Sequence, residues 1–538
     1  MLSILPYLAS RPKLCLFLLA GLPVALRLLL LPHHPVPVPD VYDEFGHLLV
    51  ADTLRHFRLA NPPHALSQFF ETFFVLQQPT YSSIYPLGQG IALAIGWTLF
   101  GLPWAGVVLS VAAFCGACYW MLRAWTSTGW ALAGGLLAVV EFGPLNPWMN
   151  CYWGGAFAAF GGCLVFGALP RICERGSIKD AVILAAGFSI HFLTRPYESI
   201  FLVLGVAGYF VVSIVQKLPA KDRQQHDKSC ATSIAKALLL AVVCMLPAVG
   251  LTLLQNKAVT GSWTTLPYQL SQYQYGVPSS LTFQANPVPH RELTPQQALD
   301  YKMQLNFHGP HTDTVTSYLL RMEYRVRFYR FFFLPALYLA LPFFLLRLKE
   351  WRYAWAAGTC LLFALGINFF PAFQFHYLAG CTGLFVLIGI AGLERLSRIT
   401  VFSNPAGLRA AQILLCLCFL HFAFWYTVHL FEGTLGQARE YETWNGINHD
   451  SGNPRVAVKE EVARIPGKLL VFVRYSPHHI FQREWVYNRA DIDGSRVVWA
   501  RDLGEDEDEE LIRYFPDRRV LLLEPDFNPP QLSPYERQ

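Results

Sequence analysis

The chain has 538 residues, of which 53% are hydrophobic and only 15% are charged, and its formal net charge is +5. Soluble domains usually carry about 25% charged residues, and the mean hydropathy of this chain is +0.32. A chain this apolar cannot bury its side chains in one water-soluble core, so the composition excludes a cytosolic enzyme, a disordered protein and a small disulfide scaffold. The sequence predicts an all-α polytopic membrane protein, and no basic tract is long enough to indicate a nucleic-acid partner.

Apolar segments of membrane-spanning length recur along the chain. A helix that crosses the bilayer needs about 20 mostly apolar residues. The segments that suit this are 13–31, 102–123, 129–145, 152–170, 179–194, 197–216, 234–256, 329–347, 352–370, 376–396 and 408–431. A further apolar stretch at 87–101 breaks the alternation of sides, and we interpret it as an interfacial or half-membrane helix. We expect about 11 to 13 transmembrane helices.

The distribution of basic residues predicts the sidedness. Lys and Arg are concentrated in loops that stay in the cytoplasm. Four loops carry such clusters, and they begin near Arg171, Lys217, Arg347 and Arg395. If these loops are cytoplasmic, the N-terminus is cytoplasmic too, and the segments 32–86 and 257–328 lie outside together with the C-terminal tail.

The tail at 432–538 differs from the rest of the chain in its pattern. The strand-like runs KLLVFVRY, RVVWARDL and RRVLLLEP alternate with polar or acidic stretches that suit helices. This alternation predicts a small α/β domain. We therefore expect a transmembrane domain at 1–431, with outer loops 32–86 and 257–328, and a soluble extracytoplasmic domain at 432–538.

Two adjacent acids, Asp43 and Glu44, follow the first apolar segment on the outer side. The chain continues as a helix, and Asp43 and His47 share one helical face because they are four residues apart. In a structural interpretation Asp43 caps the helix and Glu44 lies in its first turn, where both charges favour the helix dipole. In a functional interpretation one acid is left for chemistry, because a cap requires only one. A divalent metal ion at Asp43, Glu44 and His47 is a further alternative, although the H-E-x-x-H zinc motif requires His where Asp43 stands.

The stretch HFLTRPYESI places Arg195, Tyr197 and Glu198 between two apolar segments on the outer side. An arginine there runs against the positive-inside bias, and an ionisable residue at that depth is a functional hypothesis by default. A guanidinium suits bidentate binding of a phosphate. The alternative is an ion pair between Arg195 and Glu198 that closes a turn.

The other outer segments are rich in tyrosine, arginine and histidine. The loop 257–328 contains Tyr268, Tyr273 and Tyr275, which suit sugar faces but also an ordinary covering loop. The remaining outer candidates are Tyr85, Arg321, Arg325, His376 and Tyr377. Tyrosine also suits an interfacial belt, and a lone histidine at such a place is often structural. All these side chains are expected at the outer interface, where a phosphate-linked lipid presents its headgroup.

Together these motifs resemble the bacterial GT-C glycosyltransferases, in the RgtA/B/C/D-like branch of the protein mannosyltransferase and aminoarabinose transferase superfamily. The motifs that carry the resemblance are Tyr-Asp-Glu at 42–44, Tyr-Pro at 85–86, Arg-Pro-Tyr-Glu at 195–198 and His-Tyr at 376–377. The resemblance covers roughly 13–400 and leaves the tail out. The chain departs from many relatives in the next outer loop, where NPWMNCYWGG carries no acid.

The resemblance implies a GT-C-like fold and transfer of a sugar from a polyprenyl-phosphate donor to a glycan, lipid or protein acceptor. The reaction would take place on the periplasmic side of a bacterial inner membrane, with inversion at the anomeric carbon. Asp43 would be the general base, and Glu44 would orient it or help to hold a metal ion. The residues implied at the lipid phosphate are Arg195, Tyr85, His376, Tyr377, and Arg321 or Arg325.

Two other classes of protein stay open from the residues alone. A multispan transporter would place paired charges at mid-membrane depth, for which Glu141 and His191 are the few candidates. A non-catalytic assembly subunit that binds polymer or lipid would keep the aromatic outer loop without needing Asp43. Apart from a divalent ion no cofactor is indicated, and neither the sugar nor the acceptor can be read from the sequence.

Overall fold

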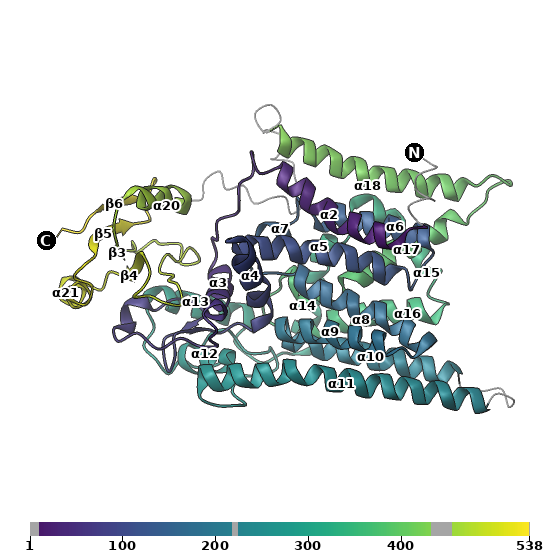
Figure 1. Ribbon diagram of the computed structural model, residues 1–538, viewed down its shortest axis with the longest axis horizontal. Helices are drawn as coiled ribbons and strands as arrows, with labels where there is room; N and C mark the ends of the chain where they lie inside the picture. Colours follow the sequence, from purple (N-terminus) through teal and green to yellow (C-terminus); the bar gives the residue numbers. More distant parts are fainter. Residues whose placement is uncertain (1–9, 218–223, 432–453, 537–538) are drawn as a thin grey trace. The chain divides into compact units, whose positions relative to one another are not determined.

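The computed structural model describes residues 10–217, 224–431 and 454–536, and Figure 1 draws the course of the chain. The chain divides into two compact units that interleave along the sequence. Unit 1 comprises Met1–Val36, Trp104–Gly250 and Asp313–Asn448. Unit 2 comprises Pro37–Pro103, Leu251–Thr312 and His449–Gln538.

Unit 1 is built from helices. They are α2 (Pro12–Leu29), α5 (Pro103–Leu122), α6 (Thr128–Phe142), α7 (Pro147–Asn150), α8 (Ala156–Arg175), α9 (Ile178–Thr194), α10 (Pro196–Lys217), the first part of α11 (Gln224–Thr260), α14 (Val315–Val326), η2 (Arg327–Phe332), η3 (Pro335–Leu339), α15 (Leu341–Leu345), α16 (Trp351–Ile367), η4 (Phe375–Cys381), α17 (Thr382–Ser397) and α18 (Ala406–Leu430). Helix α17 forms the core of this unit, because all but two of its residues are buried.

Within the described ranges, seven helices are long and apolar enough to cross a membrane. They are α2, α5, α8, α10, the apolar part of α11 from Ile234, η4 together with α17, and α18. The prediction of a helical multi-pass membrane protein is confirmed. The expected spans at 129–145, 179–194 and 352–370 are the helices α6, α9 and α16, which have 15, 17 and 17 residues. The stretch 87–101 is the short helix α4 (Leu87–Phe100).

The expected span at 329–347 is wrong in its form. The structure divides this stretch into two 3₁₀ helices, η2 and η3, and the five-residue helix α15. Pro335 and Pro342 lie within it. Each proline lacks a backbone N–H and clashes with the preceding turn, which disfavours a continuous α-helix across the pair.

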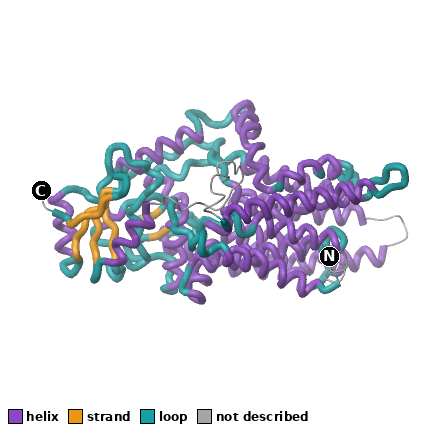
Figure 2. Tube along the Cα trace, turned by 90° about the horizontal axis from the view of Figure 1, so that it is seen from above, coloured by secondary structure: helices purple, strands orange, loops and turns teal. Residues whose placement is uncertain are grey.

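Unit 2 holds the tail and the two segments expected on the outer side, which are called the first and second outer segments below. Its elements are α3 (Tyr42–Arg55), η1 (Ser67–Phe70), β1 (Val75–Leu76), β2 (Ser82–Ser83), α4, the end of α11, α12 (Pro267–Tyr275), α13 (Pro295–His308), α20 (Pro454–Arg464), β3 (Leu469–Val473), β4 (Val497–Arg501), α21 (Glu505–Tyr514), β5 (Arg519–Glu524) and β6 (Gln531–Pro534). Strands β3–β6 form one sheet in the order β4-β3-β5-β6, in which β3 pairs parallel with β4 and β5, and β6 is antiparallel to β5. Figure 2 shows this sheet near the C-terminus. The predicted α/β character of the tail is confirmed, and the three strand-like runs are β3, β4 and β5.

The described part of the tail shares its hydrophobic core with the first outer segment. Leu49 of α3 and Phe69 and Phe70 of η1 lie in the same buried cluster as Leu470 and Phe472 of β3. The expected junction at 431–432 adjoins residues outside the described part of the chain. From Pro454 onward, however, the tail does not stand alone, because its sheet is covered by side chains that come some 400 positions earlier in the sequence.

A buried polar network joins the three segments of unit 2. Arg501 of β4 forms an ion pair of 3.0 Å with Glu484 and donates to the backbone carbonyl of Glu71 at 2.9 Å. The Glu71 carboxylate accepts hydrogen bonds from Tyr275 at 2.8 Å and from Arg291 at 2.5 Å. Because such groups are costly to bury without partners, this network fixes the tail and the second outer segment on the first one.

Candidate functional site

The two adjacent acids at the start of α3 have different partners. Glu44 is buried, and its Oε2 atom accepts hydrogen bonds from the backbone N–H groups of Asp40 at 2.9 Å and Val41 at 3.3 Å. The N-cap position is Val41, so Glu44 satisfies N–H groups at and before the helix start. The structural interpretation that made Asp43 the cap is therefore wrong, because Glu44 does this work.

Asp43 instead accepts a hydrogen bond from the hydroxyl of Tyr85. Tyr85 is itself held in place from two sides, since its N–H donates to Ser83 Oγ at 3.2 Å and its carbonyl accepts from Gln255 at 2.9 Å. Tyr85 was expected at a lipid phosphate, but the structure places its hydroxyl on the Asp43 carboxylate. Asp43 is partly exposed, whereas Glu44 is not.

The ring of Tyr85 lies close against the first turns of α3. The imidazole of His47 contacts it with ring centroids 4.2 Å apart and an angle of 30°. A Cβ atom at Gly46 would lie only 2.7 Å from a carbon of the same ring. Glycine is required at position 46 because any larger residue would push Tyr85 away from the helix and from Asp43.

Among the described residues, no group of three or more His, Cys, Asp or Glu side chains is arranged to hold a metal ion. The three residues considered for a divalent ion face different neighbours. Asp43 receives the Tyr85 hydroxyl, Glu44 accepts from the backbone, and the His47 ring stacks on Tyr85. The arrangement is that of a carboxylate positioned by a tyrosine.

Sequence analysis missed a second acid that acts on Asp43. Asp300 of α13 has no exposed surface, and burial raises its pKa to about 7. The hydrogen bond from Gln304 opposes this shift, and the charge of Asp43 adds to it. Asp300 lies in a polar stretch of the long outer loop, and nothing in its sequence context marks it as a neighbour of Asp43.

The three tyrosines of α12 divide between core and surface. Tyr275 is buried and donates to Glu71, and Tyr268 packs against the buried cluster that includes Phe74. Tyr273 is 59% exposed and stacks on His290 with ring centroids 4.1 Å apart. Of the expected sugar-facing residues, only Tyr273 presents a largely accessible ring.

In unit 1, Arg195 ends helix α9 and is partly exposed. Its guanidinium lies over the ring of Tyr377 at 5.2 Å from the centroid, and it is 3.8 Å from the Glu198 carboxylate. The expected turn-closing pair therefore exists, but at 3.8 Å it is too long to be a hydrogen bond. Within the described part of the chain the guanidinium makes no hydrogen bond to protein.

His376 and Tyr377 lie in η4 and accompany Arg195. Tyr377 carries the guanidinium on its face, and His376 is buried between Tyr377, at 4.9 Å, and Trp153, at 5.5 Å, measured between ring centroids. The structure thus brings together three of the residues expected at the lipid phosphate. Trp153 belongs to the same cluster and was not among the expected residues.

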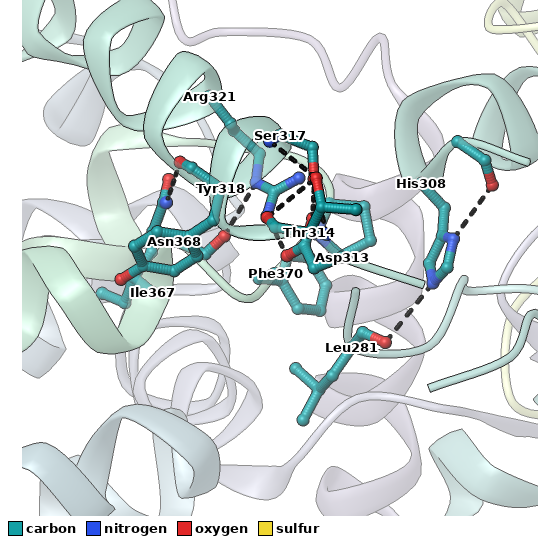
Figure 3. A network of polar contacts seen from close by, with 12 residues as sticks. Leu281, His308, Asp313, Thr314, Ser317, Tyr318, Arg321, Ile367, Asn368 and Phe370 are labelled. Carbon is teal, nitrogen blue, oxygen red and sulfur yellow. Dashed lines mark hydrogen bonds and ion pairs between the residues drawn. The ribbon is translucent and has the colours of Figure 1, made fainter. Parts of the chain in front are cut away.

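The other two expected arginines have structural partners instead. Arg325 is buried and donates to the carbonyls of Ile367 at 3.1 Å, Phe370 at 2.6 Å and Pro371 at 2.7 Å. Arg321 pairs with Asp313 and donates to the carbonyl of Asn368 at 2.8 Å, as Figure 3 shows. Both side chains hold the segment 367–372, which leads to His376, and Arg321 also holds Asp313.

No protein-family model and no curated protein matches the chain. Among solved structures it is similar to ArnT from Cupriavidus metallidurans in the apo state, with 11% identity and a TM-score of 0.49 over 94% of this chain and 92% of that chain. The same protein bound to undecaprenyl phosphate gives 11% identity and a TM-score of 0.44 over 86% and 83%. The apo oligosaccharyltransferase of Archaeoglobus fulgidus gives 12% identity and a TM-score of 0.36 over 86% and 62%. The likeness to each of these structures is at low sequence identity.

Proposed function

We propose that the chain is an integral-membrane glycosyltransferase. It moves a sugar from a polyprenyl-phosphate donor to an acceptor hydroxyl on the periplasmic side of a bacterial inner membrane. The acceptor oxygen forms the new bond to the anomeric carbon while the bond to the lipid phosphate breaks, so a single displacement inverts the configuration. Such a step needs a base for the hydroxyl proton and a cation for the departing phosphate.

Asp43 is the proposed general base. The observation that carries the proposal is the division of work at the start of α3, where Glu44 alone caps the helix. Asp43 is not used by that cap and accepts the hydroxyl of Tyr85. This hydrogen bond fixes the carboxylate, and Gly46 keeps the ring close. Glu44 acts by holding the turn that carries Asp43.

Arg195 is the proposed partner of the lipid phosphate. Its guanidinium makes no hydrogen bond within the described part of the chain, and the ring of Tyr377 fixes its plane. An arginine in this state keeps its fork of N–H donors for a phosphate, which it binds bidentately. His376, buried against Tyr377 and Trp153, supports that ring. Arg321 and Arg325 act indirectly by fixing the segment before His376.

The test measures lipid intermediates in a strain that lacks the native gene copy. Membranes with the wild-type chain, with Asp43→Asn or with no copy are extracted, and polyprenyl-phosphate sugars are identified by mass spectrometry. We expect the Asp43→Asn strain and the deletion to accumulate the same donor lipid, whose mass then identifies the sugar. Identical lipid pools in all three strains would overturn the proposal and favour a transport or scaffold role.

A matched control separates the chemistry from a general effect of the substitution. Asp517 is an exposed aspartate of the tail that pairs with Lys468 at 2.8 Å. Asp517→Asn makes the same chemical change at a surface position, and we expect its lipid pool to equal that of the wild type. The amount of inserted protein is measured for each strain by immunoblot, so that loss of the protein is not taken for loss of activity.

A further inference from the structure

Helix α13 turns a polar face inward. Its buried side chains are all polar, namely Gln296, Gln297, Asp300 and His308. The apolar residues Leu299 and Phe307 are 46% and 55% exposed. An amphipathic helix that serves only the core shows the reverse arrangement, so the inward face of α13 must meet polar groups of unit 2.

Most of this face is engaged by ordinary partners. Gln296 accepts a hydrogen bond from Arg501 at 2.7 Å, and Gln297 lies 3.5 Å from the Glu71 carboxylate. His308 lies between two backbone carbonyls, those of Leu281 and Gly309, which Figure 3 shows in part. These contacts account for the two ends of the helix but not for its middle.

Asp300 in the middle is different. One carboxyl oxygen accepts from Gln304 at 3.0 Å, and Gln304 in turn accepts from the N–H of Ser279 at 2.7 Å. The other carboxyl oxygen, Oδ1, is buried and has no hydrogen-bond partner. An ionised carboxylate in this position would leave charge uncompensated in a dry site, which is costly, whereas a protonated one would not.

The groups around Asp300 also favour the protonated form of its carboxyl. The negative charge of Asp43 on α3 raises the pKa of Asp300, and no cation among the described residues lowers that pKa. On α13 itself the neighbouring Tyr301 hydroxyl donates to the carbonyl of Pro287, and Lys302 is exposed. Two buried or half-buried carboxyl groups without a shared cation cannot both ionise at little cost.

We propose that Asp300 is a positioning residue of the acid site: its carboxyl holds a proton beside Asp43, so that the two groups together carry a single negative charge. This inference rests on the proposed role of Asp43. With Asp300 neutral, Asp43 stays ionised and ready to accept the hydroxyl proton of the acceptor. When Asp300 loses its proton, its negative charge repels that of Asp43. Asp43 then no longer has a neutral neighbour.

The first test is thermal stability of the full-length protein in lipid nanodiscs as a function of pH. The pKa of Asp300 rises from 3.8 to about 7 on folding, so its proton stabilises the folded state fully below about pH 4. That contribution is lost as the pH rises through 7. We expect the Tm of Asp300→Asn, relative to the wild type, to increase between pH 4 and pH 7 and to stay higher above that range.

Asp508 provides a matched control for this measurement. It is fully buried in α21, and burial raises its pKa to about 7 as well, but the groups that act on it are Leu503, Tyr535 and Asp502 and do not include Asp43. Asp508→Asn is expected to show a similar pH dependence of Tm. When Asp43→Asn is added to both proteins, the pH midpoint of the Tm difference caused by Asp300→Asn is expected to fall. The midpoint of the difference caused by Asp508→Asn is expected to stay the same. An unchanged Asp300 midpoint in the Asp43→Asn background would overturn the inference.

The second test follows turnover of the donor lipid that accumulates in the Asp43→Asn strain, using wild-type and variant proteins at several pH values. We expect kcat/KM of the wild type to fall as the pH rises through about 7, and Asp300→Asn, which has no carboxyl proton to lose there, to keep its kcat/KM over that range. Asp508→Asn is expected to show the same fall as the wild type. Identical pH profiles for the wild type and Asp300→Asn would contradict the inference.

The two tests separate the inference from the proposed function. If the wild type consumes no lipid at any pH, the proposed function fails, while the Tm series still decides whether Asp300 holds a proton against Asp43. If Asp300→Asn does not fold, Gln304→Met replaces it. The Gln304 hydrogen bond lowers the pKa of Asp300, so its loss must raise the pH at which the stabilising effect of the Asp300 proton is half lost. A midpoint pH that does not rise would refute the inference.

Discussion

At the start of α3 and among the arginines of unit 1, two residues of like charge have different partners. The pair at α3 is acidic, and the pair in unit 1 is basic. At the helix start two carboxylates are adjacent, and Glu44 caps the backbone whereas Asp43 meets the hydroxyl of Tyr85. Among the arginines, Arg325 donates to carbonyls of the segment 367–372, whereas Arg195 has only an aromatic face and a loose ion pair. In each region one member of a chemically similar pair holds the fold.

The difference teaches which charged residues to assign to chemistry. Residue type and expected sidedness do not separate Arg195 from Arg325, since the sequence predicts both on the outer side, against the positive-inside bias. Their hydrogen bonds do separate them. A guanidinium whose N–H groups are engaged by carbonyls stabilises a loop, and one that keeps its donors is suited to an anionic ligand.

Among the arginines, the largest expected effect is the loss of donor turnover when Arg195 is replaced. Arg195→Gln removes the proposed charge at the lipid phosphate, and we expect donor turnover to fall by about 10²- to 10³-fold with little change in Tm. Arg195→Lys keeps the charge but loses the planar fork over Tyr377, so its turnover should lie in between. Turnover of Arg195→Gln at the wild-type rate would remove the phosphate role from this residue.

Arg325 should behave in the opposite way. Arg325→Gln leaves the carbonyls of Ile367, Phe370 and Pro371 without their donor, and we expect a loss of about 2–3 kcal/mol in the free energy of unfolding. Urea or thermal unfolding in nanodiscs measures this loss. Turnover per folded molecule, measured below the melting transition, should fall far less than for Arg195→Gln. A stable Arg325→Gln protein with abolished turnover would reverse the assignment.

Gly46 tests how tightly Tyr85 must pack. Gly46→Ala places a methyl group against the ring, and overpacking of this kind costs about 1–3 kcal/mol. The hydrogen bond from Tyr85 to Asp43 should be lost or lengthened, so turnover should fall together with Tm. The matched control is Gly129→Ala, at a position of α6 where a Cβ meets open space, and it should leave turnover unchanged without lowering Tm.

Much of the fold was accessible to sequence analysis. Among the described residues, the seven helices of spanning length and the three parallel strands of the tail follow from long and short apolar runs, both of which are local signals. The stretch 329–347 was predicted as one continuous helix because its high hydropathy was given more weight than Pro335 and Pro342. The joint core of the tail and the first outer segment was not predictable, because Phe70 and Phe472 meet only through long-range packing.

The site was accessible only in part. Arg195 was predicted because an arginine at that place stands against the usual charge pattern of membrane proteins, whereas Asp43 was predicted from a pair of adjacent acids. The partners of Glu44 and Arg325 were not, because backbone acceptors and donors leave no trace in side-chain sequence. Asp300 was missed since a single acid in a polar loop is unremarkable until its burial is known.

Glu44 should give the smallest effect. Glu44→Gln weakens the cap at Asp40 and Val41 but keeps one acceptor oxygen, and we expect a loss of about 0.5–1.5 kcal/mol in unfolding free energy. Donor turnover per folded molecule should stay within a few-fold of the wild type. Thermal unfolding in nanodiscs and the lipid assay measure the two quantities on the same preparation.

The most direct test places Asp43→Asn and Glu44→Gln side by side, because the two residues are adjacent and carry the same charge. Both variants are expressed in the strain without a native copy, and donor lipid and Tm are measured for each. The account predicts that Asp43→Asn does not lower Tm and accumulates the donor lipid to the level of the deletion, which reflects a loss of about 10²- to 10⁴-fold in rate. It predicts that Glu44→Gln lowers Tm and leaves the lipid pool close to that of the wild type. A Glu44→Gln strain that accumulates donor while Asp43→Asn does not would contradict it.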